Sequence, residues 1–246
     1  MTLPPELAEA LAGLAARRPL LVASDYDGVL SPIVDVPSEA VPERGVAEAL
    51  ARLARADGVT VALVSGRGVA DLQTVSGLTG PYRWVGSHGA EFDGPVADAV
   101  ARRRDALAGA LEPLVVAVAG ARLEVKPASV AVHVRQVTDR AAAAALLADV
   151  RAAADASLTM KPGKEVLELA VTSADKGSVV RRLRNECGAA AALYLGDDVT
   201  DEDAFRALDA DDVTVKVGDG PTAARYRVAD PPAVVELLGE LGRLLA

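Results

Sequence analysis

Short apolar runs alternate with mixed polar segments along the chain, and each run stops at small or acidic residues. A nearly unbroken apolar run of this kind is typical of a strand covered on both faces of a parallel sheet. In open α/β sheets, ligands bind beyond the carboxyl ends of the strands, so the residues after each run are candidate site positions. We predict four such strands: Leu20–Ala23, Val59–Val64, Tyr82–Val85 and Ala191–Leu195.

The segments between these runs show helical spacing. In Val46–Ala56 apolar residues recur at i, i+4 and i+7, and Lys176–Cys187 also gathers its apolar residues on one side. The residues before Leu20 predict a short amphipathic helix. Alternating strands and helices predict an α/β fold with a doubly wound, Rossmann-like parallel sheet as its core.

The pattern changes between about residue 93 and residue 173. Two pairs of apolar segments flank turns that contain Pro or Gly, which predicts two antiparallel hairpins, each preceded by an Ala-rich helix. The sequence therefore predicts an inserted α/β domain of order αββαββ at 93–173, within a discontinuous core formed by 1–92 and 174–246. The predicted elements are Ala97–Val118, Leu123–Val125, Val130–Val137, Thr138–Ala154, Leu158–Met160 and Val166–Val171.

Composition narrows the class of protein. With 246 residues and 51% hydrophobic content, the chain can bury a substantial core, and global disorder is excluded. A formal net charge of −9 without a Lys/Arg run argues against a nucleic-acid partner. Cys187 is the one cysteine, so an intramolecular disulfide is excluded. No stretch is long and apolar enough for a membrane span, and the N-terminus has the reverse charge order of a signal peptide. We expect a soluble, cytoplasmic protein without a membrane partner.

The first candidate motif, Asp25-Tyr26-Asp27-Gly28, follows a predicted strand. Two carboxylates at one strand end can divide the work of hydrolysis. An ionised Asp25 would serve as nucleophile, while Asp27 would protonate a leaving group and then activate water. The alternative is an acidic turn without chemistry, because Asp and Gly are common in turns.

The second motif is Gly196-Asp197-Asp198-Val199-Thr200-Asp201-Glu202-Asp203. Each pair of like charges at ~4 Å costs roughly 4 kcal/mol at an effective dielectric constant near 20, so a hard divalent cation with oxygen ligands is the natural partner of this cluster. The alternative is that the acids favour the N-terminus of a helix at Ala204–Leu208.

Two weaker motifs are Ser65-Gly66-Arg67 at a strand end and Lys176-Gly177 at a helix start. A hydroxyl, backbone amides and a lysine suit the oxygens of a phosphoryl group. Taken singly, each has a commoner interpretation, as a helix-capping serine or a solvent-exposed lysine.

In this order along the chain, the four motifs resemble those of the haloacid dehalogenase-like phosphohydrolase superfamily. The finer strings are similar to those of trehalose-6-phosphate phosphatases, and the resemblance covers essentially the whole chain. Val29 departs from the family pattern, which usually has Thr there. The strings are Asp25–Gly28 with Leu30-Ser31-Pro32-Ile33, Ser65-Gly66-Arg67, Gly86-Ser87-His88-Gly89-Ala90-Glu91, Val132-His133-Val134-Arg135, Gly163-Lys164-Glu165-Val166-Leu167-Glu168 and Gly196–Asp203.

The resemblance implies Mg²⁺-dependent hydrolysis through an aspartyl-phosphate intermediate. It makes Asp25 the nucleophile, Asp27 the acid/base, and Ser65 and Lys176 the residues that stabilise the phosphate and the intermediate. It also makes the inserted domain a cap that binds the sugar. The implied metal ligands are Asp25, the backbone carbonyl of Asp27 and Asp197, with Asp198 and Asp201 nearby. The implied substrate-binding residues are Ser65, Gly66, Arg67, His88, Arg135, Lys164 and Glu168.

Two of these substrate residues have simpler interpretations. His88 can be a satisfied turn histidine, and Glu168 can pair with Lys164 across a hairpin. For the whole chain we expect release of inorganic phosphate from trehalose 6-phosphate. The alternatives are a phosphatase for sucrose 6-phosphate or a mannosyl-phosphoglycerate, and a non-catalytic sugar-phosphate sensor. The resemblance further implies a functional association with a trehalose-6-phosphate synthase.

Overall fold

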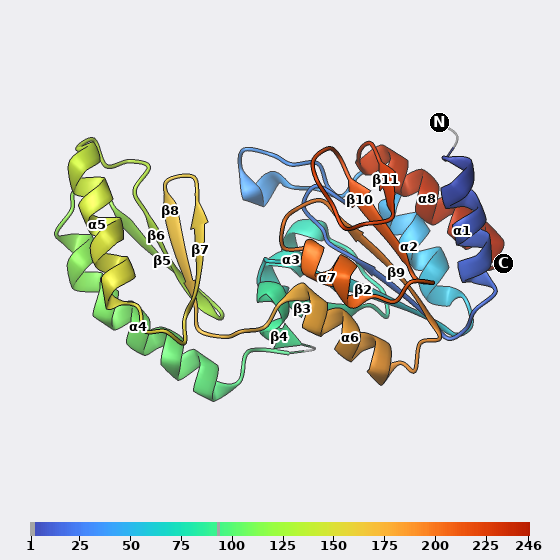
Figure 1. The fold of residues 1–246 in the computed structure, drawn as a ribbon, viewed down its shortest axis with the longest axis horizontal. Coiled ribbons are helices and arrows are strands. Elements are labelled where there is room, and N and C mark those ends of the chain that lie inside the picture. Colours follow the sequence, from blue (N-terminus) through green and yellow to red (C-terminus); the bar gives the residue numbers. More distant parts are fainter. Residues whose placement is uncertain (1–2, 93) are drawn as a thin grey trace. The chain divides into compact units, whose positions relative to one another are not determined.

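A parallel sheet forms the centre of the first of two units in the computed structural model (Figure 1), which describes residues 3–92 and 94–246. The first unit consists of Met1–Gly89 with Ala174–Ala246, and the second of Ala90–Ser173. Asp93, where we expected the insert to begin, lies outside the described residues. The α/β fold with an inserted αββαββ segment is confirmed.

The sheet has the strand order β11-β10-β9-β1-β2-β3-β4. Strands β1, β2, β3, β9, β10 and β11 pair in parallel, and Ser24 at the end of β1 lies opposite Leu63 of β2 and Leu195 of β9. The carboxyl ends of these three strands therefore lie side by side. The strands are β1 (Leu20–Ser24), β2 (Val59–Val64), β3 (Arg83–Gly86), β4 (Glu91–Phe92), β9 (Ala191–Gly196), β10 (Val213–Val217) and β11 (Tyr226–Val228).

Helices cover both faces of this sheet, which is why β1 and β9 are buried along their whole length. Apolar residues of α1, α2 and α8 share one core with alternate residues of β1, β2 and β9, such as Leu20, Val22 and Leu193. On the other side α6 packs against α7 and β1. The helices are α1 (Pro5–Ala15), α2 (Val46–Arg55), α3 (Val69–Ser76), α6 (Lys176–Glu186), α7 (Glu202–Ala207) and α8 (Pro231–Leu244), with 3₁₀ turns η1 (Pro37–Glu39) and η2 (Ser87–Gly89).

The second unit is an antiparallel sheet of order β5-β6-β8-β7 with two helices. Its own core joins Leu111 of α4 and Leu146 of α5 to Val130, Val132 and Leu167 of the sheet. The expected hairpins and helices are present, with ends shifted by a few residues. The elements are α4 (Asp98–Val116), β5 (Arg122–Lys126), β6 (Ser129–His133), α5 (Arg140–Ala153), β7 (Thr159–Gly163) and β8 (Val166–Ala170).

Three elements near the C-terminus, β10, β11 and α8, and the helix α3 were not among the predicted ones. Strand β10 lacks an apolar run because Thr214 and Lys216 interrupt it, yet both side chains are buried. Among the described residues, no helix has the length and apolar character of a membrane span.

The central position of β9 predicts a large effect of a cavity there. Leu193 is fully buried in the core of the first unit, so we expect Leu193→Ala to lower the free energy of unfolding by about 2–5 kcal/mol. Urea unfolding followed by the fluorescence of Trp84, the chain's one tryptophan, measures this. Val41→Ala, at a side chain that is 64% exposed, is the control and should change stability by less than about 0.5 kcal/mol. Equal effects of the two variants would contradict the assignment of this core.

Candidate active site

The nucleophile candidate Asp25 lies directly after β1, where it is only 6% exposed. Its backbone N–H donates to the carbonyl of Leu195 on the neighbouring strand β9 (2.9 Å). Its carboxylate accepts from the N–H of Tyr26 at 2.6 Å and from the Nζ of Lys176 at 2.5 Å. Both oxygens are thus held, and each keeps a further lone pair.

Gly28 brings this loop against the acidic loop that follows β9. Its φ is +76°, and a Cβ there would lie 2.0 Å from Oδ2 of Asp197. Only glycine permits both that backbone conformation and that approach. The Gly of the Asp-x-Asp-Gly motif therefore has a structural reason beyond its frequency in turns.

Lys176 opens α6, the first helix after the chain returns to the first unit. A capping box of Asp175 and Ser178 fixes the start of this helix. The Lys176 ammonium is 1% exposed and donates to both Asp25 and Asp201, the latter at 2.8 Å. The alternative interpretation, a solvent-exposed lysine, is therefore wrong, and the helix start places a buried cation between two carboxylates.

Asp201 holds the acidic loop together. One oxygen accepts from Lys176 and from the hydroxyl of Tyr194 (2.7 Å), and the other from the backbone N–H groups of Asp197 (3.1 Å) and Asp198 (3.0 Å). Because each of its oxygens already has two donors, Asp201 serves chiefly to shape the loop. Asp198 and Asp203 are exposed to solvent.

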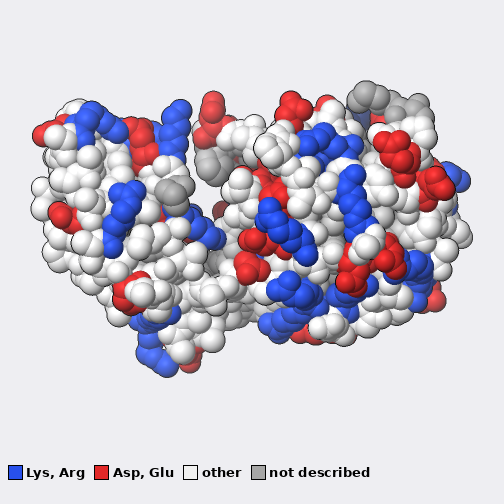
Figure 2. Space-filling view, in the orientation of Figure 1, with Lys and Arg blue, Asp and Glu red and all other residues white. Residues whose placement is uncertain are grey.

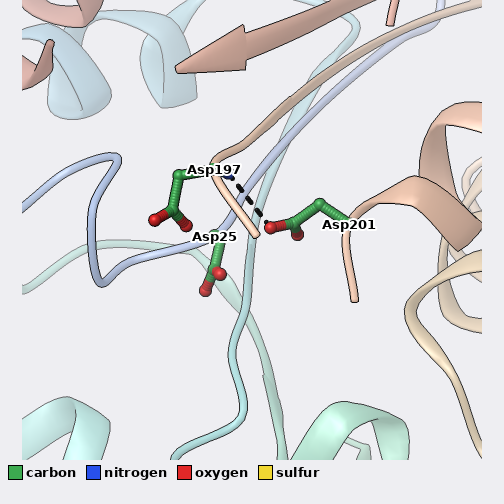
Figure 3. Close-up of side chains that lie close together, drawn as sticks. All are labelled: Asp25, Asp197 and Asp201. Atoms are coloured by element: carbon green, nitrogen blue, oxygen red, sulfur yellow. Dashed lines mark hydrogen bonds between the residues drawn. The ribbon is translucent and has the colours of Figure 1, made fainter. Parts of the chain in front are cut away.

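Asp25, Asp197 and Asp201 form a cluster in which one carboxylate oxygen from each lies within 4.8 Å of the others (Figure 3). Burial raises the pKa of Asp25 to about 7, against a lowering by Lys176 and a further raising by Asp201. Burial and the charge of Asp201 also raise the pKa of Asp197 to about 6. Burial lowers the pKa of Lys176, but the charges of Asp25 and Asp201 raise it above its ordinary value, so this ammonium stays protonated.

A divalent cation with a preference for oxygen fits this donor set. Carboxylate oxygens are the ligands that Mg²⁺ takes in proteins, and three carboxylates gather here beside the buried ammonium of Lys176. Asp25 and Asp197 have the freer oxygens. The carboxylate of Asp27 instead pairs with Arg67. The backbone carbonyl of Asp27 is therefore the group of this residue that we expect to bind the metal.

The Ser65-Gly66-Arg67 loop follows β2 and lies against His88. Ser65 is 1% exposed; its Oγ accepts from the N–H of Arg67 at 3.1 Å, and its carbonyl accepts from the N–H of His88 at 3.0 Å. A Cβ on Gly66 would lie 2.7 Å from Cε1 of His88, so the imidazole packs directly on this glycine. These contacts place His88 beside the Ser65 loop within the first unit.

The other three substrate-residue candidates lie in the second unit. Glu168 of β8 accepts from the Nζ of Lys126 and the Oγ of Ser129, both at 2.7 Å. Burial alone would raise the pKa of Glu168, but the hydrogen bond and charge of Lys126 lower it below its usual value. The alternative pairing of Glu168 with Lys164 is wrong, because Lys126 on β5 takes that place. Lys164 is exposed in the β7–β8 turn, and Nε of Arg135 lies 3.9 Å from Glu165.

Sequence reasoning missed several residues that hold the site. The buried Lys216 of β10 donates to the backbone carbonyl of Asp197, and Thr222 donates to Glu202 at 2.7 Å. A lysine within an otherwise apolar strand was the available signal for Lys216. On the face drawn in Figure 2, Lys and Arg side chains are interspersed with Asp and Glu.

A doubly wound sheet with an inserted αββαββ unit, and an Asp-x-Asp loop that meets a buried lysine and an acidic loop, are the features of the haloacid dehalogenase-like class. Within this class, the family model described as trehalose-phosphatase matches residues 23–232. The chain belongs to the trehalose-phosphatase family.

Individual relatives agree. A trehalose-phosphate phosphatase of Mycobacterium marinum is 37% identical over 256 residues, which cover 95% of this chain and 64% of the relative. This chain thus spans just under two thirds of that relative's length. The crystal structure of a trehalose-6-phosphate phosphatase related protein matches with a TM-score of 0.72 and 27% identity, covering 91% of this chain and 97% of the other. An Aspergillus fumigatus trehalose-6-phosphate phosphatase matches with a TM-score of 0.71 and 26% identity, covering 96% and 97%.

The raised pKa of Asp197 predicts how stability depends on pH in metal-free buffer. Its folded value of about 6 exceeds the ordinary 3.8, so ionisation above pH 6 costs stability, and this cost fades as the pH falls from 6 toward 4. We therefore expect Asp197→Asn to be more stable than the unsubstituted protein by about 1–2 kcal/mol at pH 8 in EDTA, with little difference near pH 4. Urea unfolding followed by Trp84 fluorescence measures both, and a pH-independent difference would contradict the argument.

Magnesium should reverse this order. Binding to the folded state alone raises stability by about 2.7 kcal/mol when the free ion exceeds its Kd a hundredfold, and the loss of the Asp197 carboxylate should abolish most of this gain. Thermal unfolding with and without MgCl₂ measures it. Asp203→Asn changes an exposed acid of the same loop and should keep the full response. Equal responses of Asp197→Asn and the unsubstituted protein would place the ion elsewhere.

Proposed function

We propose that this chain is a Mg²⁺-dependent phosphatase that hydrolyses trehalose 6-phosphate to trehalose and inorganic phosphate. The observation that carries the proposal is the setting of Asp25, a nearly buried carboxylate held by a buried ammonium beside Asp197. A second carboxyl, Asp27, stands two residues further along the same loop. The family and the relatives named above support the choice of substrate.

The first step forms a bond between a carboxylate oxygen of Asp25 and phosphorus. The bond from phosphorus to the sugar oxygen breaks, its electron pair stays on that oxygen, and the carboxyl of Asp27 supplies the proton that makes it a hydroxyl. In the second step Asp27 takes a proton from water, whose oxygen attacks phosphorus. The bond to Asp25 then breaks and returns its carboxylate.

Two residues hold the phosphoryl group in this scheme. The Oγ of Ser65 accepts from the N–H of Arg67, so its own hydrogen is available to a phosphoryl oxygen. Lys176 supplies a fixed positive charge next to the attacking oxygen. His88 and Gly66 complete this end of the substrate site.

We assign the metal to Asp25, the backbone carbonyl of Asp27 and Asp197, with Asp198 and Asp201 around them. When bound, a magnesium ion supplies positive charge that offsets these carboxylates and the phosphoryl oxygens. Asp201 contributes by holding the N–H groups of Asp197 and Asp198, which sets the direction of the loop.

The inserted domain at 93–173 serves in this proposal as the cap that selects the sugar. Glu168 is prepared for this role because Lys126 and Ser129 fix both of its oxygens, and a rigid carboxylate loses little entropy when it binds a sugar hydroxyl. We assign Lys164 and Arg135 to the same substrate end. A cytoplasmic location and an association with a trehalose-6-phosphate synthase stay predictions.

A panel of phosphate esters tests the reaction. We expect phosphate release from trehalose 6-phosphate in the presence of MgCl₂, its loss in EDTA, and slower turnover of sucrose 6-phosphate and mannosyl-phosphoglycerate. Asp25→Asn should lower kcat by at least about 10³-fold, because a carboxamide cannot form the acyl phosphate. Binding of trehalose 6-phosphate without any release of phosphate would instead support the sensor alternative.

The cap assignment has its own test. Glu168→Gln should raise KM for trehalose 6-phosphate about tenfold, equivalent to about 1.4 kcal/mol, and leave kcat for p-nitrophenyl phosphate unchanged because that ester has no sugar. Glu112→Gln, at an exposed position of the same unit, should change neither. An equal loss for both esters would assign Glu168 a structural role.

A further inference from the structure

The guanidinium of Arg67 forms a bidentate ion pair with the carboxylate of Asp27. Nε donates to Oδ2 at 2.7 Å, and Nη2 donates to Oδ1 at 2.8 Å. The Arg67 side chain is 11% exposed and that of Asp27 33%. A planar fork on a carboxylate fixes its orientation as well as its position.

Other contacts fix the guanidinium itself. Nη2 also donates to the carbonyl of Pro37 at 2.8 Å, and Nη1 donates to Asp71 on α3 at 2.9 Å. The ring of Tyr26 lies 6.0 Å from its central carbon, within cation–π range. Four of the five N–H groups of Arg67 are therefore engaged, so a two-point contact with a phosphoryl group would require one of these bonds to break.

We propose that Arg67 is a positioning residue that holds the Asp27 carboxyl at the leaving-group oxygen, instead of a ligand of the phosphoryl group. The proposal rests on the phosphatase function proposed above. It replaces the substrate-binding role expected for Arg67 from the sequence. Asp27 follows a fully buried tyrosine and precedes a glycine with positive φ, and without the fork its partly exposed side chain would be free to rotate away from the leaving oxygen.

The geometry requires arginine at this position. Lysine would keep the charge but offer a single ammonium without a planar fork, so Arg67→Lys should lose the orientation of Asp27. Arg67→Gln removes both charge and fork. Arg243→Gln serves as the matched control, because it removes a guanidinium in the same way on α8, where the side chain is 67% exposed and pairs with Glu240.

Two esters separate the two roles of Arg67. The ratio kcat/KM covers the steps up to phosphorylation of Asp25, where a sugar alkoxide needs a proton and p-nitrophenolate does not. We expect both Arg67 variants to lower kcat/KM for trehalose 6-phosphate about 10²-fold and that for p-nitrophenyl phosphate less than about threefold, with Arg243→Gln unchanged for both esters. Parallel losses for both esters would overturn the proposal, because a phosphoryl ligand serves both.

A double-substitution cycle with Asp27→Asn gives an independent answer. Asp27→Asn alone should lower kcat/KM for the sugar ester by about 10²–10⁴-fold. If Arg67 acts through Asp27, adding Arg67→Gln costs less than about threefold more. Multiplied losses, or a raised inhibition constant for inorganic phosphate in Arg67→Gln, would overturn the proposal.

Crystal structures of Arg67→Gln and Arg243→Gln test the positioning directly and do not depend on any substrate. We expect the Asp27 carboxylate to leave its present orientation only in Arg67→Gln, with an unchanged melting temperature showing that the fold is intact. An unmoved Asp27 would overturn the proposal.

Failure of the unsubstituted protein to hydrolyse any ester would overturn the proposed function, while these structures would still decide the role of Arg67. Should Arg67→Gln fail to fold, Arg67→Lys carries the same comparison.

Discussion

The burial of one ammonium among carboxylates is the constraint on which this site depends. Lys176 is almost inaccessible to water, and its Nζ lies within hydrogen-bond distance of Asp25 and Asp201. Desolvation of an ion costs several kcal/mol unless partners surround it, so α6, β1 and the loop after β9 must all come together. Asp25 and Lys176 are 151 positions apart, and the whole second unit lies between them in the chain. After the inserted domain, the chain must therefore re-enter the first unit so that α6 begins with Lys176 beside Asp25.

The same cluster holds more carboxylates than ammonium groups. Asp25, Asp197 and Asp201 face the ammonium of Lys176, while Lys216 reaches the carbonyl of Asp197. Proteins keep such an imbalance where an ion or a charged substrate supplies the remainder. Asp201 accepts from two backbone N–H groups, and Glu202 accepts from Thr222 and Ala223, and these bonds fix the shape of the loop. The formal net charge of −9 therefore conceals a local cluster of carboxylates, because a sum over the chain does not show where the charges lie.

Much of the fold could be predicted from local sequence patterns. The buried strands β1, β2 and β9 are apolar runs in the sequence, and Pro and Gly turn residues mark the hairpins of the second unit. Strand β10 was not predicted, because its polar residues Thr214 and Lys216 are buried only by virtue of partners that the tertiary structure supplies. In the site, the strand-end motifs located Asp25, Ser65 and Asp197 correctly on one sheet edge. Contacts between distant segments, such as Lys126 with Glu168, have no local signal. Spacing alone also could not show that both oxygens of Asp201 would be taken by hydrogen bonds.

The carboxylates of Asp25 and Asp27, which only Tyr26 separates in the sequence, have different surroundings, and this difference suits them to different tasks. Tyr26 between them is fully buried, and its hydroxyl donates to the carbonyl of Ala40 at 2.5 Å, which anchors the loop. With that anchor, Asp25 is turned to Lys176 and the acidic cluster, whereas Asp27 is turned to Arg67 and remains partly open to solvent. A nucleophile needs a desolvated, oriented oxygen, while an acid/base must exchange protons with water. In the proposed function, the environment of each side chain, more than its identity, divides the roles of nucleophile and acid/base between Asp25 and Asp27.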